Sequence, residues 1–480
     1  MKIYPNQALT FDDVLLVPQR SAVRSRSDVS TVTRLSRRIE MNLPIVSANM
    51  DTVTEYQMAV AMARAGGIGI IHRFMTAERE ADEVRRVKRA ESHIVEHPST
   101  LGPEAAAREA QATMSRLGIG GLVVVDAANR PVGIVTGRDV QFAPGEALVS
   151  AIMTPAPRMI TAPADTSLEE AKRILHEHRI EKLPLIDGDG RLAGLITRRD
   201  INNMLQHPHA TKDAKGRLRV GAAVGVQPGF LARAALLIEA GADVIVVDIA
   251  HGHSDNAIDA VTALRREFGD IEIVAGNVAT AAGTRDLIEA GADAVKVGVG
   301  PGSICITRIV TGFGVPQLTA IADCAEAARP FEAPVIADGG IQTSGDVAKA
   351  LAAGADSVML GSLLAGTDES PGVVVMRNNR RYKVSRGMAS LGATMDRPDR
   401  RSKEGEDDPD MTEVVAEGVE AAVPYRGSAQ DVLNQLVGGL RSALSYGGAT
   451  TIQELQANAE FMLISQAGVR ESHPHDVDVL

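Results

Sequence analysis

A short repeat constrains the fold of this chain more than any other feature. The tetrapeptide Ala-Gly-Ala-Asp begins a short apolar run at residues 240–248, 290–298 and 353–361. Each copy follows a helix-like segment, and each run is apolar throughout, as is typical of a strand covered on both faces. Residues 271–277 and 334–340 add two similar strands. Helices that alternate with buried strands predict a parallel sheet of the α/β class.

The predicted strands end in residues that suit a functional site. These ends are Asp248, Asn277, Gly298, Asp338 and Gly361. In a (β/α)8 TIM barrel the site lies at the carboxyl ends of the strands, and we expect this fold. A doubly wound sheet is the competing fold, but it would carry a dinucleotide-binding glycine fingerprint after its first strand, and none is present.

A second repeat lies inside residues 93–207. Residues 119–139 recur as 180–200, and both copies contain Gly-x-x-Thr-x-x-Asp. The two copies resemble a tandem pair of CBS modules, which implies a regulatory nucleotide such as ATP or GTP. The residues implied at its ribose and phosphate are Thr136, Asp139, Thr197 and Asp200. The alternative is a spacer that binds no nucleotide.

The barrel is therefore expected to be interrupted. Residues 1–92 and 208–480 would form it, and 93–150 and 151–207 would be the two inserted modules. Insertion into a surface loop is well tolerated. Polar hinges are expected near residues 96–98 and 207–213, and a mobile flap at about residues 385–425.

Composition excludes several classes of partner. The net charge of −11 argues against a nucleic-acid surface, and two cysteines in 480 residues provide no disulfide framework. The amino terminus has no apolar signal core, and no apolar stretch approaches membrane-spanning length. We expect a cytoplasmic protein with no membrane partner.

Cys305 is the candidate nucleophile. It lies in the segment GVGPGSICITR, residues 298–308, where glycines let the backbone approach a ligand closely. Exposed backbone N–H groups and the nearby Arg308 would favour the reactive thiolate. Cys324 lies in a helix-like segment and is better interpreted as a small buried apolar residue.

With this loop in place, the chain resembles the IMP dehydrogenase/GMP reductase family along essentially its whole length. The matching segments are TFDDVLLVP (10–18), ANMDTV (48–53), AGNVAT (275–280), GPGSIC (300–305), ADGG (337–340), MLGS (359–362) and RESHPHD (470–476). Each is weak by itself. Their order, and their positions at predicted strand ends, make the resemblance specific.

The resemblance implies a purine nucleotide whose C2 is attacked by Cys305 to give a covalent thioimidate. Asp338 would accept hydrogen bonds from the ribose, although a helix N-cap is its structural alternative. The other residues implied at the substrate are Ser303, Gly340, Gly361, Ser362, Gly387, Met388 and Glu417. Those implied on the nicotinamide-nucleotide side are Asp248, Ser254, Asn277 and Gly298.

The resemblance also implies a monovalent cation, K⁺, that would fix the loop. Backbone carbonyls of Gly300, Gly302 and Cys305 would bind it together with Glu471, Ser472 and His473 of a neighbouring subunit in a homotetramer. An octamer formed through the CBS modules is the larger assembly considered. His251 and His253 are better interpreted as polar loop residues than as metal ligands, because no further ligand spacing completes a site.

Both enzymes of the family form the thioimidate, so the fold does not separate them. The dehydrogenase converts IMP to XMP with NAD and needs a base for hydrolysis, for which the family uses an Arg–Tyr pair on the flap. Arg400 aligns with that arginine, but Arg401 stands where the tyrosine is expected. An unassisted arginine is a poor base because its pKa exceeds about 12.

The reductase converts GMP to IMP and ammonia with NADPH, and the resemblance assigns proton transfer to Thr307 and Glu417. Asn49 also stands where dehydrogenases carry Ala or Pro, while Ser385 replaces a tyrosine common in dehydrogenases. The CBS pair and the tail at residues 471–476 are commoner on dehydrogenases. We favour the reductase with NADPH over the dehydrogenase with NAD. The third hypothesis is that the protein is a catalytically inactive nucleotide sensor.

Overall fold

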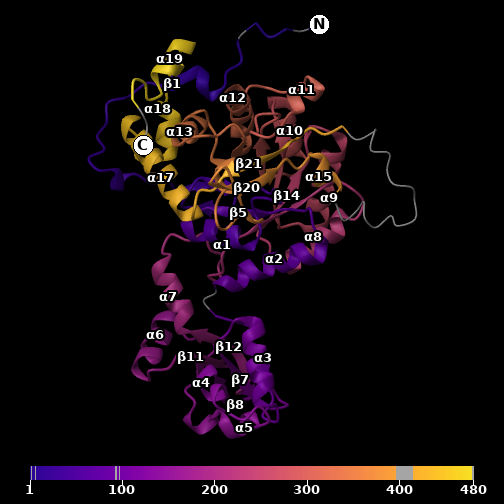
Figure 1. Cartoon of the computed structure of the whole chain (residues 1–480), viewed down its shortest axis with the longest axis vertical. Coiled ribbons are helices and arrows are strands. Elements are labelled where there is room, and N and C mark those ends of the chain that lie inside the picture. The colour runs from indigo at the N-terminus through magenta and orange to yellow at the C-terminus, as the bar shows by residue number, and fades with distance from the viewer. Residues whose placement is uncertain (2, 6, 92–93, 97, 396–414, 478–480) are drawn as a thin grey trace. The chain divides into compact units, whose positions relative to one another are not determined.

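The computed structural model describes the chain except for residues 2, 6, 92–93, 97, 396–414 and 478–480 (Figure 1). It divides the chain into two compact units. The barrel unit comprises Met1–Lys88, His209–Asp213 and Leu218–Leu480, and the inserted unit comprises Arg89–Pro208 with Ala214–Arg217. None of the described helices has the length and apolarity needed to cross a bilayer.

The barrel unit is built on a closed sheet of parallel strands. Going round the barrel, they are β13 (Gly221–Val224), β14 (Val244–Asp248), β15 (Glu272–Val278), β16 (Ala294–Val297), β17 (Val335–Asp338), β18 (Ser357–Leu360), β4 (Ile45–Ser47) and β5 (Ile68–Ile71). Strand β4 pairs with β18 and β5 pairs with β13, so segments on either side of the insertion complete one sheet. The predicted fold class, a (β/α)8 barrel interrupted by an inserted pair of repeats, is confirmed. The doubly wound alternative is wrong.

Helices surround this sheet. They are α1 (Tyr56–Ala65), α2 (Ala77–Ala90), α8 (Phe230–Glu239), α9 (Asp255–Phe268), α10 (Ala281–Glu289), α12 (Gln317–Ala328), α13 (Ser344–Ala352), α14 (Ser362–Ala365) and α17 (Ala429–Tyr446). Helix α17 packs against both α13 and α1, which are far from each other in the sequence. Buried leucines at residues 433, 436, 440 and 444 recur at helical spacing and form its inner face.

The Ala-Gly-Ala-Asp repeat forms a helix-to-strand turn. Its glycine ends the helix in the left-handed region, with φ of 100° at Gly241, 116° at Gly291 and 111° at Gly354. Its aspartate Oδ2 accepts a hydrogen bond from a backbone N–H at the start of the neighbouring strand. The pairs are Asp243 with Val220 (2.8 Å), Asp293 with Ile273 (2.9 Å) and Asp356 with Val335 (2.8 Å). Each copy therefore ties the amino-terminal ends of two neighbouring strands together.

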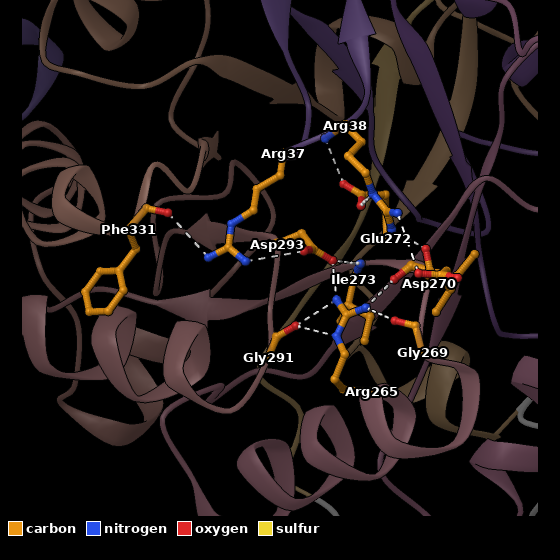
Figure 2. A network of polar contacts seen from close by, with 11 residues as sticks. Arg37, Arg38, Arg265, Gly269, Asp270, Glu272, Ile273, Gly291, Asp293 and Phe331 are labelled. Carbon is orange, nitrogen blue, oxygen red and sulfur yellow. Dashed lines mark hydrogen bonds and ion pairs between the residues drawn. The ribbon is translucent and has the colours of Figure 1, made fainter.

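Around one of these aspartates the amino-terminal ends of β15 and β16 carry a wider polar network (Figure 2). Arg265 on α9 donates to the Asp293 carboxylate, and Arg37 lies 3.6 Å from the other oxygen of that carboxylate. Arg38 Nε donates to Glu272 Oε1 at 2.5 Å. This end of a barrel supports stability, whereas the opposite end carries the chemistry.

Smaller elements complete the barrel unit. A three-stranded antiparallel sheet consists of β19 (Val374–Arg377), β20 (Arg380–Arg386) and β21 (Glu420–Pro424). Strand β1 (Val14–Leu16) pairs with β22 (Phe461–Leu463), and β2 (Thr33–Arg34) pairs with β3 (Glu40–Met41). The short helices are α11 (Thr307–Thr311), α15 (Leu391–Met395), α18 (Ile452–Asn458) and α19 (Gln466–Glu471).

The inserted unit contains two similar halves. The first has the sheet β6 (Thr100–Leu101), β7 (Gly121–Val125), β8 (Pro131–Thr136) and β9 (Thr154–Pro155) with α3 (Ala107–Leu117), α4 (Gly137–Gln141) and α5 (Val149–Ile152). The second has β10 (Ala162–Pro163), β11 (Lys182–Ile186) and β12 (Leu192–Thr197) with α6 (Leu168–Glu177) and α7 (Arg198–Gln206). Asp126 and Asp187 occupy equivalent turns, since each Oδ1 accepts N–H bonds of 2.9 and 2.8 Å from residues two and four positions later. The sequence repeat is therefore also a structural repeat.

Candidate active site

Cys305 lies on the loop between β16 and α11, at the carboxyl end of the barrel strands. The loop closes on itself through a hydrogen bond from the Cys305 N–H to the Gly302 carbonyl of 3.1 Å, and Cys305 is partly exposed. The Arg308 guanidinium donates to the Val299 and Val315 carbonyls at 3.4 and 2.6 Å. Arg308 therefore braces the two ends of the loop, and its hydrogen bonds are to backbone rather than to the thiol that we expected it to activate.

A proton path leads away from the thiol. Cys305 Sγ donates to Thr307 Oγ1 at 3.2 Å, and Thr307 Oγ1 donates to Glu417 Oε2 at 2.8 Å. The Thr307 hydroxyl has one proton and donates it to Glu417, while its oxygen accepts from Cys305. The three side chains therefore form a continuous series of hydrogen bonds. Thr307 and Glu417 are 110 positions apart in the sequence, and only the fold brings them together.

Backbone hydrogen bonds hold the segment that carries Glu417 against the cysteine loop. The Ile306 N–H donates to the Glu417 carbonyl at 2.9 Å, and the Glu417 N–H donates to the Ala389 carbonyl at 3.0 Å. The Gly387 N–H donates to the Val419 carbonyl at 3.0 Å, which places Gly387 and Met388 beside the segment that carries Glu417. Glu417 is thus positioned by its backbone, and its side chain is left for chemistry. Arg400 and its neighbour Arg401 lie outside the described residues.

The residues predicted at the substrate phosphate lie at neighbouring strand ends. Gly340 follows β17 with φ of 81°, and Gly361 follows β18 and precedes α14, whose first residue is Ser362. A Cβ built on Gly340 would lie 3.3 Å from the Phe11 ring, and one on Gly361 would lie 3.2 Å from the Met50 sulfur. Both glycines therefore let the backbone approach neighbouring side chains closely. Ser303, on the cysteine loop, is exposed.

Asp338 ends β17 and faces the barrel interior. The N-cap alternative for it is wrong, because α13 begins at Ser344 and Thr343 is its cap. Asp338 Oδ2 accepts from Lys296 Nζ at 2.7 Å and from Asn277 Nδ2 at 2.9 Å. Its carboxylate is thus held from two strands and remains 22% exposed toward the open end of the barrel.

The residues predicted on the cofactor side begin at Asp248, the last residue of β14. Burial alone would raise the pKa of Asp248, but the Lys296 ammonium, 2.7 Å from Oδ1, outweighs burial and the pKa is lowered. Asn277 Nδ2 also donates to the Gly298 carbonyl at 2.8 Å. The structure therefore links three of the four predicted cofactor residues to one cluster.

The fourth predicted cofactor residue, Ser254, is the N-cap of α9 and makes no capping hydrogen bond with its side chain. His253 Nε2 lies 2.7 Å from Asp286 Oδ2, and His251 is exposed. No group of three or more His, Cys, Asp or Glu side chains suited to a metal ion occurs in the part of the chain that the structure describes.

Sequence reasoning missed Lys296. Its side chain is 2% exposed within the strand Ala294–Val297, whose other members are apolar. A lysine is almost never fully buried unless it is paired, so a single charge in an apolar barrel strand was the available signal. The resemblance supplied no role for it.

The tail residues of the predicted cation site lie on and just after α19. Glu471, Ser472 and His473 are exposed. Ser472 Oγ donates to the Gly468 carbonyl at 2.8 Å, and the His473 N–H donates to the Arg470 carbonyl at 3.2 Å. Among the described contacts of this chain, none joins these tail residues to the carbonyls of Gly300, Gly302 or Cys305.

The inserted unit has its own cavity, of about 880 Å³. Seven basic or imidazole side chains line it: Arg138, Arg158, Lys172, His176, Arg179, Lys182 and Arg198. Thr136 also lines it, whereas Asp139, Thr197 and Asp200 are not among the described lining residues. Asp139 Oδ2 accepts from the Thr136 hydroxyl at 2.7 Å, and Asp200 Oδ2 from the Thr197 hydroxyl at 2.5 Å. Each aspartate therefore has a capping role at the start of α4 or α7.

The fold and the arrangement at its strand ends define a (β/α)8-barrel enzyme with an inserted second unit. Comparison with known proteins then specifies the family. The family model described as "IMP dehydrogenase / GMP reductase domain" matches residues 8–475. The chain belongs to this family, whose members are oxidoreductases that act on purine nucleotides with a nicotinamide nucleotide.

Some relatives are named dehydrogenases and others are named reductases. An inosine-5'-monophosphate dehydrogenase from Nitrosopumilus maritimus is 56% identical, with 98% of each chain covered. A GMP reductase from Leishmania major is 50% identical, with 99% of this chain and 98% of the relative covered. Among solved structures, a cysteine-to-alanine variant of GMP reductase from Trypanosoma brucei, in complex with guanosine 5'-monophosphate, superimposes with a TM-score of 0.93 at 45% identity and 98% coverage of both chains. The family is therefore certain, and the names divide between two reactions.

Proposed function

We propose that the protein is a GMP reductase that converts GMP to IMP and ammonia with NADPH. The thiolate of Cys305 attacks C2 of the guanine ring, and the amino group at C2 leaves as ammonia to give a thioimidate. C2 then accepts a hydride, which NADPH supplies, and the C2–S bond breaks to release IMP and the thiolate. Thr307 and Glu417 supply the proton that makes ammonia a leaving group.

The observation that carries this proposal is the series of hydrogen bonds from Cys305 through Thr307 to Glu417, of 3.2 and 2.8 Å. Such a path can take the thiol proton and return it to the departing nitrogen. The dehydrogenase step that has no counterpart in the reductase is hydrolysis. In the dehydrogenase, the base for hydrolysis comes from the Arg–Tyr pair on the flap. This chain has Arg401 in place of that tyrosine.

The second candidate is the dehydrogenase, which oxidises IMP to XMP with NAD. It is favoured by the names of relatives, since dehydrogenases at 56% and 53% identity stand above the reductase at 50%. Both candidates use the Cys305 thioimidate. The inactive-sensor reading is disfavoured because Cys305, Thr307 and Glu417 are all in place.

The deciding experiment compares GMP plus NADPH with IMP plus NAD, each followed by nicotinamide absorbance, with ammonia and XMP measured separately. We expect turnover with ammonia release in the first, and at most slow hydride transfer in the second. Steady XMP formation that is faster than IMP formation from GMP would assign the dehydrogenase. Absence of turnover in both, with nucleotide binding intact, would assign the sensor.

The substrate contacts in this proposal are those that the family resemblance assigns to matching positions. Ser303, Gly340, Gly361 and Ser362 hold the phosphate, Gly387, Met388 and Glu417 the base, and Asp338 the ribose. On the other side Asp248, Ser254, Asn277 and Gly298 hold the nicotinamide nucleotide. The lowered pKa of Asp248 suits this role, because an ionised carboxylate accepts hydrogen bonds from ribose hydroxyls.

The remaining sites are regulatory or structural. We propose that ATP or GTP binds the inserted unit and changes activity, because its cavity is lined by Arg138, Arg158, Lys172 and further cations that suit a polyphosphate. Calorimetry with ATP and GTP on the full chain and on Arg158→Ala tests this. Absence of binding to the full chain would favour the spacer alternative, and equal binding to both proteins would show that Arg158 does not contact the nucleotide. A cytoplasmic homotetramer, or an octamer, in which K⁺ binds the Gly300–Cys305 carbonyls and a neighbour's tail, completes the proposal.

A further inference from the structure

The buried lysine at the centre of the barrel contacts groups from three other strands. Lys296 Nζ lies 2.7 Å from Asp248 Oδ1 on β14 and 2.7 Å from Asp338 Oδ2 on β17. It also donates to Asn277 Oδ1 on β15. An ammonium has three protons, and here each has an oxygen acceptor. The lysine is thus fully satisfied and has no proton left for a ligand.

The backbone makes room for this arrangement. In the parallel pairing of β15 with β16, Gly276 lies opposite Lys296. A Cβ at position 276 would lie 2.5 Å from the Lys296 carbonyl oxygen and 2.8 Å from its Cβ. Only glycine fits there, so the two strands approach closely at the position of the buried lysine.

The positive charge of Lys296 compensates the negative charges of two carboxylates. The two carboxylates that it joins are 21% and 22% exposed, at the open end of the barrel, whereas the lysine is closed off beneath them. The other groups that face the cluster are Arg73, which acts on Asp248 through its charge, and the neutral Asn49 and Asn277. Two carboxylates at one site without a cation between them do not both ionise readily, because like charges raise the pKa of one of them.

We propose that Lys296 is a positioning residue that couples the substrate site to the cofactor site, by holding the ribose acceptors of both as one ion cluster. The proposal deepens the function proposed above and rests on its assignment of Asp338 to the substrate and Asp248 to the nicotinamide nucleotide. The hydrogen bonds that Asp338 accepts from Lys296 and Asn277 both use Oδ2, which leaves Oδ1 to accept from a ribose hydroxyl. One side chain therefore sets the orientation of acceptors on both sides of the reacting carbon.

The test measures binding of GMP, IMP, NADPH and NAD to the full-length protein by calorimetry from pH 6 to 9, as the ratio of variant to wild-type affinity. Titration of the nucleotide phosphate affects binding to both proteins equally and therefore cancels in this ratio. In Lys296→Met we expect GMP and IMP to bind about 100-fold more weakly near neutral pH, since a charge-assisted hydrogen bond is lost and two carboxylates repel. We also expect the ratio to change with pH, because the carboxyl pair now titrates.

The double variant Lys296→Met/Asp248→Asn is the matched control. It keeps Asp338 as the single carboxylate, so we expect GMP binding to recover about tenfold and the pH dependence of the ratio to disappear. Nicotinamide-nucleotide binding should be weak in the double variant, as in Asp248→Asn alone. A lysine with a purely structural role would give pH-independent losses that the second substitution makes worse.

The outcomes separate this inference from the reaction assignment. If Lys296→Met is folded, by its thermal unfolding, and binds all four nucleotides within threefold of wild type, the coupling is refuted. If that variant does not fold, the double variant decides, and its failure to bind GMP while folded refutes the coupling. Unchanged binding in Asp338→Asn and Asp248→Asn would overturn the site assignment together with this inference. A wrong choice between reductase and dehydrogenase would show only in turnover, because GMP and IMP share the ribose contact.

Discussion

Replacing Glu417 by glutamine tests the proton path at its end. The Glu417 side chain accepts one hydrogen bond of 2.8 Å from Thr307, while its backbone makes the contacts that hold the segment against the cysteine loop. Glutamine can still accept that hydrogen bond through its amide oxygen but cannot take up a proton. We therefore expect the geometry to survive and proton transfer to fail.

The magnitude follows from the chemistry that is removed. A positioned general acid–base group contributes about 10²–10⁴-fold to a rate, which is about 2.7–5.4 kcal/mol of transition-state stabilisation. The kcat for GMP with NADPH should fall by about that factor in Glu417→Gln. A rise in KM would measure the separate contribution of Glu417 to binding of the base.

Thr307 provides the matched controls. Thr307→Ser keeps the hydroxyl and should retain kcat within about tenfold, whereas Thr307→Val breaks the path and should resemble Glu417→Gln. Nicotinamide absorbance and ammonia release give the rates, and thermal unfolding checks the fold. The reductase assignment also requires Arg400→Ala and Arg401→Ala to matter much less than Glu417→Gln.

Two results would refute this reasoning. A kcat in Glu417→Gln within tenfold of wild type would show that the proton takes another path. The opposite ranking, with Arg400→Ala trapping a covalent purine adduct detectable by mass spectrometry, would show that hydrolysis on the flap limits the reaction. That ranking is the behaviour of a dehydrogenase.

Three further predictions concern the nucleophile, pH and the far end of the barrel. Cys305→Ser should abolish turnover yet keep nucleotide binding in calorimetry, because a hydroxyl is a much weaker nucleophile at neutral pH, and activity within tenfold of wild type would contradict this. Burial raises the pKa of Asp356 from 3.8 to about 6, so the folded state binds a proton that the unfolded state has lost between these values. Relative to Asp356→Asn, the wild-type free energy of unfolding should therefore fall by about 2.4 kcal/mol as pH rises from 4 to 7 in denaturant titrations, and a constant difference would count against it. Asp293→Ala leaves the Arg265 guanidinium without its carboxylate partner, although its bonds to backbone carbonyls remain, and leaves the Ile273 N–H without its side-chain acceptor. It should lower the free energy of unfolding by about 3 kcal/mol without changing kcat in the folded enzyme.

The sequence alone determined the fold class, because the pattern that encodes it is local. Each Ala-Gly-Ala-Asp copy places a left-handed glycine after a helix and an aspartate before a buried strand, and three copies specify the rhythm of a barrel. The insertion into the barrel could also be predicted from the sequence, since the inserted segment contains its own repeat. Cys305 stood out for the same reason, as a reactive side chain in a glycine-rich loop.

Only the tertiary structure decided which polar groups meet. The Thr307–Glu417 contact spans 110 positions, and the resemblance named the pair without its geometry. The sequence left open the alternative that Asp338 is a helix N-cap. The structure excludes this alternative, because Thr343 is the N-cap of the following helix. The cluster around Lys296 draws on four neighbouring strands, whose closure no local pattern encodes. Hydrogen bonds of this kind depend on the register between strands that helices separate in the chain, and that register is a property of the assembled sheet rather than of any one segment.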